Sequence, residues 1–203
     1  MIKYKAIFLV LFCLVVKNLA SQSYYVSEQG DSIYCKILEN DPDGLRVKKV
    51  KKEWIAAENI QAYSLSSDRE IYKRKKYNNG KKDEYILLPS GKTGNYKFTG
   101  GDVSVLTDGT TAFYQVFRQE GNPVDMGVDI ELDIYIENKE GFSRLDYGRS
   151  NKEKREEIIK TLRQYLGSNE AVMAKLNDEE NADLRRKGIV KLMEEYFKQK
   201  LPK

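Results

Sequence analysis

The chain has 203 residues, with 35 Lys and Arg against 31 Asp and Glu, and it contains no histidine. The absence of histidine removes the commonest general base and metal ligand. It also excludes Ser–His and Cys–His nucleophile arrangements, so the composition argues against most hydrolytic enzymes.

Residues 1–21 have the order of a secretory signal peptide. Lys3 and Lys5 form a positive start, 6–16 is an unbroken apolar run, and 19–21 supplies small residues for cleavage. The run is shorter than the roughly 20 apolar residues that a membrane-spanning helix needs, which argues against the alternative of a signal anchor. We therefore expect export, cleavage after Ala20 or Ser21, and a mature protein that is not integral to a membrane.

Cleavage would change both the charge and the cysteine content. Loss of residues 1–21 takes away Lys3, Lys5 and Lys17 and no acid. The mature chain then has 32 basic residues against 31 acidic ones, a net charge of +1. A mature chain with so little net charge lacks the overall excess of positive charge that is typical of nucleic-acid-binding proteins. Cys13 leaves with the signal peptide, so Cys35 cannot form an intramolecular disulfide.

The chain has no Asn-x-Ser/Thr acceptor for N-glycosylation, which favours a bacterial envelope protein. Such a protein would be periplasmic, or extracellular and at the cell surface.

Residues 22–149 are predicted to be rich in β structure. The stretch "SIYCKIL" alternates, with Cys35 on the same face as Ile33 and Ile37, so we expect a buried cysteine. Asn79-Gly80 and Asp108-Gly109 are strong hairpin dipeptides, because both central residues tolerate positive φ. Further strands are expected in "LRVKKV", "EWIAAENIQAYSL", "REIYKRKKY", "DEYILL", "DVSVLT", "TTAFYQVF", "VDIELDIYIE" and "FSRLDY".

Residues 150–203 change to a helical period. Ser150 and Glu153 form a capping-box pattern before the first helix, whose apolar residues recur until Gly167. A short second helix is expected in "NEAVMAKL", and a third in 178–200, which Gly188 would divide. The apolar stripes of these helices are expected to pack on the sheet.

The predicted fold class is α+β, with antiparallel hairpins first and about three helices afterwards. Residues 24–66 are long enough to close an SH3-like or Sm-like small barrel, with a second sheet after it. Under that alternative the β-rich region would divide near 67–76.

The stretches "YYVSEQGDSIYCKIL", "EWIAAENIQAYSL" and "IVKLMEEYFK" resemble uncharacterised secreted envelope proteins of Bacteroidota-type bacteria. These combine a signal peptide, a G-D-x-I-x-x-x-I strand, a β region and C-terminal helices, and Cys35 stands where such proteins usually have Gly. The resemblance implies an envelope location and this fold, and it implies no activity.

Three short motifs invite a catalytic or binding interpretation, and in each the pattern is incomplete. Gly91-Lys92-Thr93 ends like a phosphate-binding loop, but Ile86 stands where the first glycine belongs and no helix can follow, so we expect a loop between strands. The turn "ENDPDG" resembles a calcium loop, but Val50 occupies the position of the bidentate acid. In "VDIELDIYIE", acids at alternate positions stand parallel and cannot converge on one ion, so a solvated face is expected.

Charge is unevenly distributed along the chain. Residues 46–82 carry 12 basic and 4 acidic side chains, and residues 119–147 carry 8 acidic and 2 basic ones. Tyr72, Tyr77 and Tyr85 interleave the basic stretch, as in surfaces that bind anionic polymers. The favoured interpretation is protective lysines on edge strands.

These observations predict no catalytic, cofactor-binding or metal-binding residue. The first hypothesis is a secreted, non-catalytic binding or structural module whose partner is an envelope protein or an anionic glycan, and neither a nucleic acid nor a nucleotide. The alternative is a carbohydrate-binding or carbohydrate-active protein that uses exposed tyrosines and the acidic strand.

Overall fold

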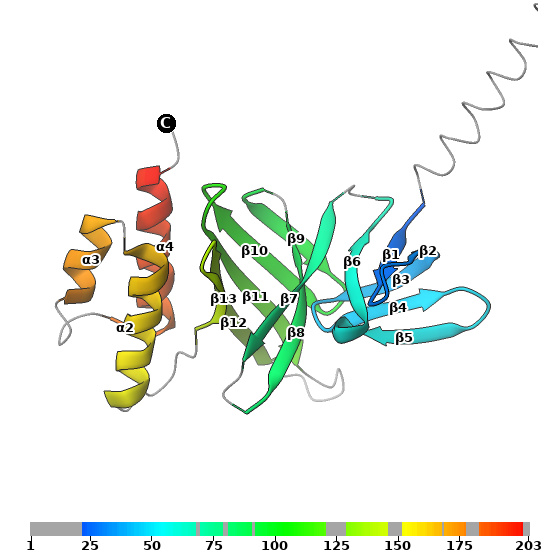
Figure 1. Cartoon of the computed structure of the whole chain (residues 1–203), viewed down its shortest axis with the longest axis horizontal. Coiled ribbons are helices and arrows are strands. Elements are labelled where there is room, and N and C mark those ends of the chain that lie inside the picture. Colours follow the sequence, from blue (N-terminus) through cyan, green and yellow to red (C-terminus); the bar gives the residue numbers. More distant parts are fainter. Residues whose placement is uncertain are drawn as a thin grey trace, which may run out of the picture. The chain divides into compact units, whose positions relative to one another are not determined.

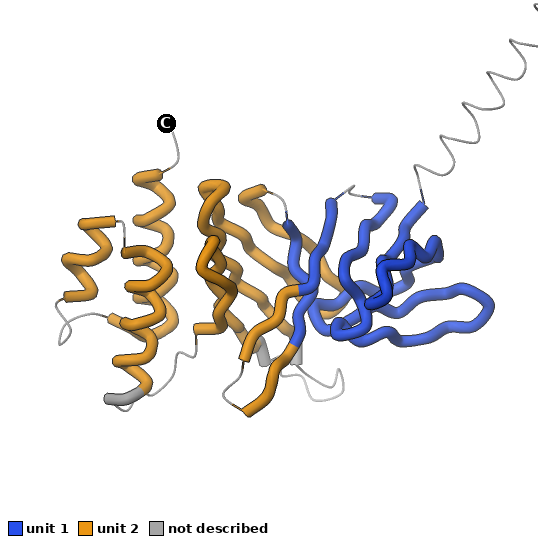
Figure 2. The backbone as a smooth tube through the Cα atoms, in the orientation of Figure 1, with its two compact units in different colours: residues 1–74, 85–91 blue, residues 75–84, 92–203 orange. Residues whose placement is uncertain are grey.

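The computed structural model describes residues 22–67, 70–78, 81–90, 92–120, 129–145, 152–167, 169–177 and 183–200. The predicted signal peptide, the Asn79-Gly80 turn and Ser150 lie outside these ranges. The described chain is α+β, with three antiparallel sheets followed by three helices. It divides into two compact units, one comprising 1–74 and 85–91 and the other 75–84 and 92–203 (Figure 2).

Unit 1 contains a three-stranded sheet and most of a five-stranded sheet. The three-stranded sheet has the order β3 (Lys36–Asp41), β4 (Gly44–Lys48) and β5 (Lys52–Ala56). The five-stranded sheet has the order β2-β1-β6-β7-β8. Its strands are β1 (Tyr24–Ser27), β2 (Ser32–Tyr34), β6 (Ile60–Ser64), β7 (Ile71–Asn78) and β8 (Asp83–Pro89), and a short 3-10 helix, Ala57–Asn59, precedes β6.

The alternative of a small closed barrel for residues 24–66 is wrong for the described strands, because the chain changes sheets within this segment. "SIYCKIL" is two strands rather than one, since β2 pairs with β1 and β3 pairs with β4. Cys35 lies at the break between them and is half-buried, not buried as expected. "EWIAAENIQAYSL" is likewise divided by the 3-10 helix into β5 and β6.

The core of unit 1 joins its two sheets. Tyr63 and Tyr72, opposite each other in β6 and β7, stack with ring centroids 4.4 Å apart. Leu45 and Val47 of β4 are fully buried. The backbone N–H of Leu87 in β8 donates to the Pro42 carbonyl at 2.7 Å, so the turn after β3 is tied to the larger sheet.

Unit 2 is built on a five-stranded sheet of order β13-β12-β11-β10-β9. Its strands are β9 (Gly94–Phe98), β10 (Gly101–Thr107), β11 (Ala112–Glu120), β12 (Asp129–Asn138) and β13 (Gly141–Arg144). β9 was not predicted as a strand. The expected hairpin at Asp108-Gly109 is confirmed, but its loop has four residues, because the Asp108 carboxylate accepts hydrogen bonds from the Thr110 and Thr111 N–H groups.

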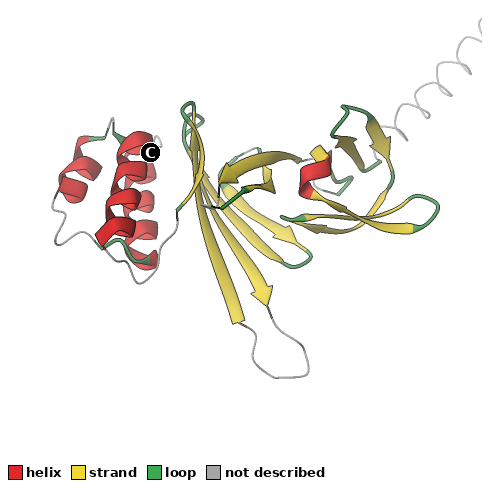
Figure 3. Cartoon of the chain, turned by 60° about the horizontal axis from the view of Figure 1, so that its bottom comes forward, coloured by secondary structure: helices red, strands yellow, loops and turns green. Residues whose placement is uncertain are grey.

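The helices α2 (Lys152–Leu166) and α4 (Arg186–Lys200) cover one face of this sheet, and α3 (Glu170–Asn177) packs against α2 on the side away from the sheet (Figures 1 and 3). The predicted helical stripes are confirmed as core, since they pack on Phe113, Leu132, Ile134 and Ile136. The helix residues of this core are Ile158, Ile159, Leu162, Tyr165, Leu166, Val172, Leu176, Ile189, Leu192, Met193, Tyr196 and Phe197.

Gly188 lies inside α4 and does not divide it. A Cβ at this position would stand 1.9 Å from the Asp183 carbonyl oxygen, so the glycine allows the preceding chain to fold against the first turn. α3 begins after Asn169, whose side-chain oxygen accepts the Val172 N–H at 3.0 Å.

Candidate functional site

The acidic strand β12 has its two faces in different surroundings. Leu132, Ile134 and Ile136 pack on the helices, while Asp133 and Tyr135 point to the opposite face and are also buried. The expected solvated face is therefore wrong at these two positions. Of the expected acids, Glu131 is exposed, and the side chain of Asp129 lies outside the described residues.

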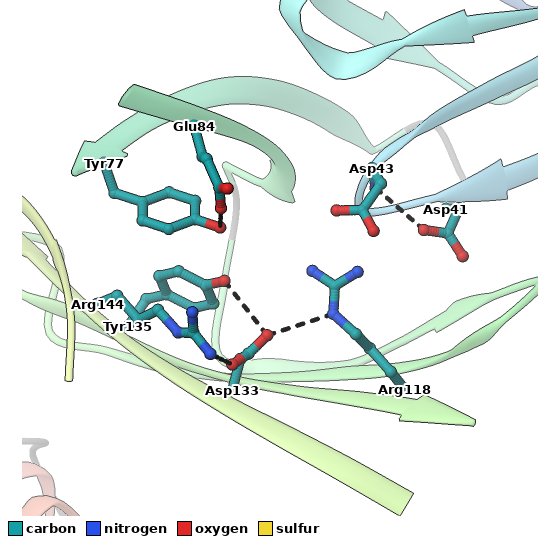
Figure 4. Close-up of polar contacts among 8 residues, drawn as sticks. All are labelled: Asp41, Asp43, Tyr77, Glu84, Arg118, Asp133, Tyr135 and Arg144. Carbon is teal, nitrogen blue, oxygen red and sulfur yellow. Dashed lines mark hydrogen bonds and ion pairs between the residues drawn. The ribbon is translucent and has the colours of Figure 1, made fainter. Parts of the chain in front are cut away.

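Asp133 is the centre of a buried polar cluster. It is 6% exposed and receives Arg118 Nε at 3.3 Å and an Arg144 guanidinium nitrogen on its other oxygen (Figure 4). The Tyr135 hydroxyl donates to the same carboxylate at 3.5 Å. Burial alone would lower the pKa of Arg144, but the Asp133 charge outweighs it and the pKa is raised. We call Asp133, Arg118, Arg144 and Tyr135 the Asp133 cluster.

The tip of the β7–β8 hairpin, which belongs to unit 2, covers this cluster. Tyr77 meets Tyr135 edge to face, with centroids 5.2 Å apart, and its hydroxyl donates to Glu84 at 2.8 Å (Figure 4). Phe142 stacks on Tyr135 with ring centroids 5.3 Å apart and also meets the Tyr77 ring edge to face at 6.4 Å. Burial, with the Glu84 hydrogen bond, raises the pKa of Tyr77 to about 12, and burial next to Asp133 raises the pKa of Tyr135.

A second ion pair fixes the same hairpin tip. Lys75 pairs with Glu137 of β12, and the Tyr114 hydroxyl donates to the other Glu137 oxygen at 2.8 Å. Burial next to Glu137 raises the pKa of Tyr114. Asp133 and Glu137 are each paired with basic side chains and lie next to tyrosine rings, an arrangement that stabilises the fold. In the described chain no group of three or more Cys, Asp or Glu could hold a metal ion.

Three of the four basic residues of β7, Arg74, Lys75 and Lys76, make contacts within the fold, and Lys73 is exposed. Arg74 donates to the Glu58 carbonyl and its guanidinium lies 5.1 Å from the Tyr85 ring centroid, while Lys76 pairs with Asp83 at 2.6 Å. β7 lies between β6 and β8, so the interpretation of the basic stretch as edge protection is wrong for its lysines, whereas β5, which carries Lys52, is an edge strand of the three-stranded sheet. Tyr72 and Tyr77 are buried and Tyr85 is half-buried, which leaves little aromatic surface here for an anionic polymer.

A further group of exposed charges lies on one face of the β3–β4–β5 sheet. Lys36 of β3 is the register partner of Lys48 in β4, and Lys48 is the partner of Lys52 in β5. All three are exposed, and no carboxylate pairs with their ammonium groups within the part of the chain that the structure describes. Directly opposed residues share a face, so three lysines form one row across the sheet.

A second row lies beside the lysines on the same face. Glu39 of β3 and Trp54 of β5 are the partners of Arg46, on either side of it. Arg46 Nε lies 2.7 Å from Glu39 Oε2, and Trp54 is 48% exposed. We call Lys36, Glu39, Arg46, Lys48, Lys52 and Trp54 the lysine face.

Gly44 positions the Trp54 indole on this face. A Cβ at Gly44 would lie 2.7 Å from Trp54 Cζ2 and 2.9 Å from Cε2, so the ring rests against the bare backbone of β4. The opposite face of β4 carries Leu45 and Val47, both fully buried. The sheet therefore presents an aromatic ring, a row of cations and one ion pair on a surface that the core holds in place.

Sequence reasoning missed this site because it treated residues 46–82 as one basic stretch and Trp54 as an apolar strand residue. The available signal was the alternation itself, since Arg46 and Lys48 stand on the face opposite Leu45 and Val47. Lys36 could not have been added, because only the pairing of β3 with β4 brings it beside Lys48.

The other two motifs include connections between strands, residues 90–93 in one case and residues 42 and 43 in the other. A strand begins at Gly94, directly after Thr93, and the Thr93 hydroxyl donates to the Thr107 carbonyl at 3.1 Å, which confirms the expected loop between strands. In "ENDPDG", Asp41 Oδ1 accepts the Asp43 N–H at 3.0 Å, as a turn requires (Figure 4).

A scan of protein-family models, a search of curated proteins and a search of solved structures each found no match to this chain. Among the described residues, no helix combines the length and the apolar character needed to cross a membrane.

Proposed function

We propose that this protein is an exported, non-catalytic binding module of a bacterial envelope, and that its lysine face captures an anionic macromolecule. The row of Lys36, Lys48 and Lys52 carries the proposal. Like charges directly opposite each other on neighbouring strands destabilise a sheet, so a row of unpaired lysines has a cost for folding. An anionic partner would relieve that repulsion when it binds.

The surroundings of the row support binding rather than catalysis. Glu39, on the same face, is paired with Arg46, and Glu53, next to Lys52 in β5, pairs with Lys49 at 2.9 Å. The carbohydrate-active alternative depended on the acidic strand, and Asp133 of that strand is buried between two arginines. The resemblance to Bacteroidota-type secreted proteins stays a prediction that agrees with this proposal.

The test uses the purified chain without residues 1–21 and immobilised dextran sulfate as a polyanion. We expect retention that weakens steeply with salt, because the attraction is screened over about 8 Å at physiological ionic strength. Changing Lys36, Lys48 and Lys52 to Gln should abolish retention. A matched variant with Lys160, Lys191 and Lys198 on the helices changed to Gln removes equal charge and should be retained like the wild type.

Equal losses in both variants would show that only net charge matters, and unchanged retention in the first would remove the lysine face from the function. Export itself is tested by the intact mass of the secreted form, which should lack residues 1–20 or 1–21. A secreted form that retains Met1 would contradict the signal peptide.

A further inference from the structure

The geometry of the lysine face limits the class of ligand that can bind to it. Neighbouring strands lie about 4.8 Å apart, so the row of Lys36, Lys48 and Lys52 spans about 10 Å across the sheet at its backbone. The row of Glu39, Arg46 and Trp54 is displaced by two residues in β4 and β5, about 6.6 Å along the strands, and by three in β3, where the register shifts between Ile37 and Glu39. An extended ligand that crosses the strands would thus meet a row of cations along one side and a ring with a polar pair along the other.

Resting on the proposed function, we infer that the anionic partner is a linear acidic polysaccharide. Its carboxylate or sulfate groups contact the lysine row, and the apolar face of one pyranose ring stacks on Trp54. Trp54 is suited to this contact because its indole is half exposed and is held by the backbone at Gly44. A tryptophan provides a large, rigid contact surface whose ordering has a low entropic cost.

The Glu39–Arg46 pair distinguishes this ligand from a nucleic acid. Sugar hydroxyls both donate and accept hydrogen bonds, so they match a site that offers a guanidinium and a carboxylate side by side. The phosphodiester linkages of a nucleic acid offer no hydrogen-bond donor to the Glu39 carboxylate, whereas the hydroxyls of a polysaccharide do. The pair therefore favours a hydroxyl-rich anionic chain over single-stranded DNA or RNA.

Two probes of similar charge test the polysaccharide inference separately from the proposed function. Oligogalacturonate has carboxylates on pyranose rings, whereas inorganic polyphosphate has no ring. Trp54→Ala should weaken oligogalacturonate binding by at least about tenfold, the loss typical of a truncated central aromatic contact. Polyphosphate binding should stay within about twofold, because it depends on charge alone. Trp54→Phe, which keeps a ring, should restore part of the oligogalacturonate binding.

Trp54 is the single tryptophan of the chain, so its emission reports directly on this site. Oligogalacturonate should change that emission at saturation, and neutral dextran should not. Equal effects of Trp54→Ala on both probes, or single-stranded DNA that binds as tightly as oligogalacturonate, would overturn the polysaccharide inference and leave the proposed function standing. If the variant with Lys36, Lys48 and Lys52 changed to Gln bound oligogalacturonate and polyphosphate as tightly as the wild type, both the polysaccharide inference and the proposed function would be overturned.

Discussion

Lys48 and Lys52 lie directly opposite each other in the antiparallel pair of β4 and β5, with both side chains on the exposed face. Cross-strand pairs of like charge destabilise a sheet by a few tenths to about 1 kcal/mol. Lys52→Gln should therefore raise the free energy of unfolding by about 0.2–1 kcal/mol while it weakens polyanion binding.

Urea unfolding and salt-dependent retention measure these two effects on the same variant. Lys160→Gln, on the exposed surface of α2, should change neither. An unchanged or lower stability of Lys52→Gln would show that the opposed lysines do not repel each other, and it would remove the main support for the proposed function.

Gly44 should resist substitution even though it adjoins an exposed ring. A Cβ there would stand 2.4 Å from the Ile55 carbonyl oxygen, and backbone on the neighbouring strand cannot move without breaking the ladder. Gly44→Ala should lower the free energy of unfolding by about 1–3 kcal/mol, as overpacking does. It should also shift the Trp54 fluorescence emission, because the indole can no longer pack against the backbone at residue 44.

Both effects are measured by denaturant unfolding followed through tryptophan fluorescence. Ser32→Ala, an exposed strand position in the other sheet of unit 1, should stay within about 0.5 kcal/mol of the wild type. A Gly44→Ala variant of native stability and native emission would contradict the close packing of Trp54 on β4.

The Asp133 cluster should be a major determinant of the stability of unit 2. Asp133→Asn would leave Arg118 and Arg144, whose side chains are 20% and 33% exposed, without a counter-charge. Breaking a fully buried pair costs about 3–5 kcal/mol, and the partial exposure of these arginines lowers the expectation to about 2–3 kcal/mol. Chemical unfolding would measure the change.

The control for Asp133→Asn is Glu140→Gln, in the exposed turn between β12 and β13, which should cost less than about 0.5 kcal/mol. If the two variants had the same stability, Asp133 would be an ordinary surface acid. The solvated face predicted from the sequence would then be restored.

Local sequence patterns predicted where most of the helices and strands form. They did not predict which other elements pack against each one. The stripe of Ile158, Leu162 and Tyr165 indicated a helix and a core face, because helical period and burial are properties of one segment. Asp108-Gly109 indicated a hairpin for the same reason.

The Asp133 cluster could not be predicted from such patterns. Alternation along β12 separates two faces but does not show whether a second element covers the polar one, and here the hairpin carrying Tyr77 and Lys75 does so. The cover comes from residues more than fifty positions earlier in the chain. The lysine face has the same origin, since Lys36 joins it only through the pairing of β3 with β4.

The buried tyrosines predict a loss of stability in alkali. Burial, with the hydrogen bond to Glu84, raises the pKa of Tyr77 to about 12, whereas an unfolded tyrosine has a pKa of about 10. Between these values the unfolded chain releases a proton that the native state keeps, so the free energy of unfolding falls as pH rises. The contribution is complete below about pH 10 and is lost progressively up to about pH 12. Tyr114 and Tyr135, raised in the same direction, should extend the fall.

Urea unfolding at a series of pH values from about 8 to 11 tests this expectation. Tyr77→Phe removes both the proton and the hydrogen bond to Glu84, so it should be less stable than the wild type at neutral pH and should lose stability less steeply above about pH 10. Tyr34→Phe, on a strand where the ring is 54% exposed, serves as the control and should reproduce the wild-type slope. A Tyr77→Phe slope equal to that of the wild type would mean that Tyr77 ionises as readily in the native state as in the unfolded chain. The hairpin tip would then not cover Tyr135 in solution.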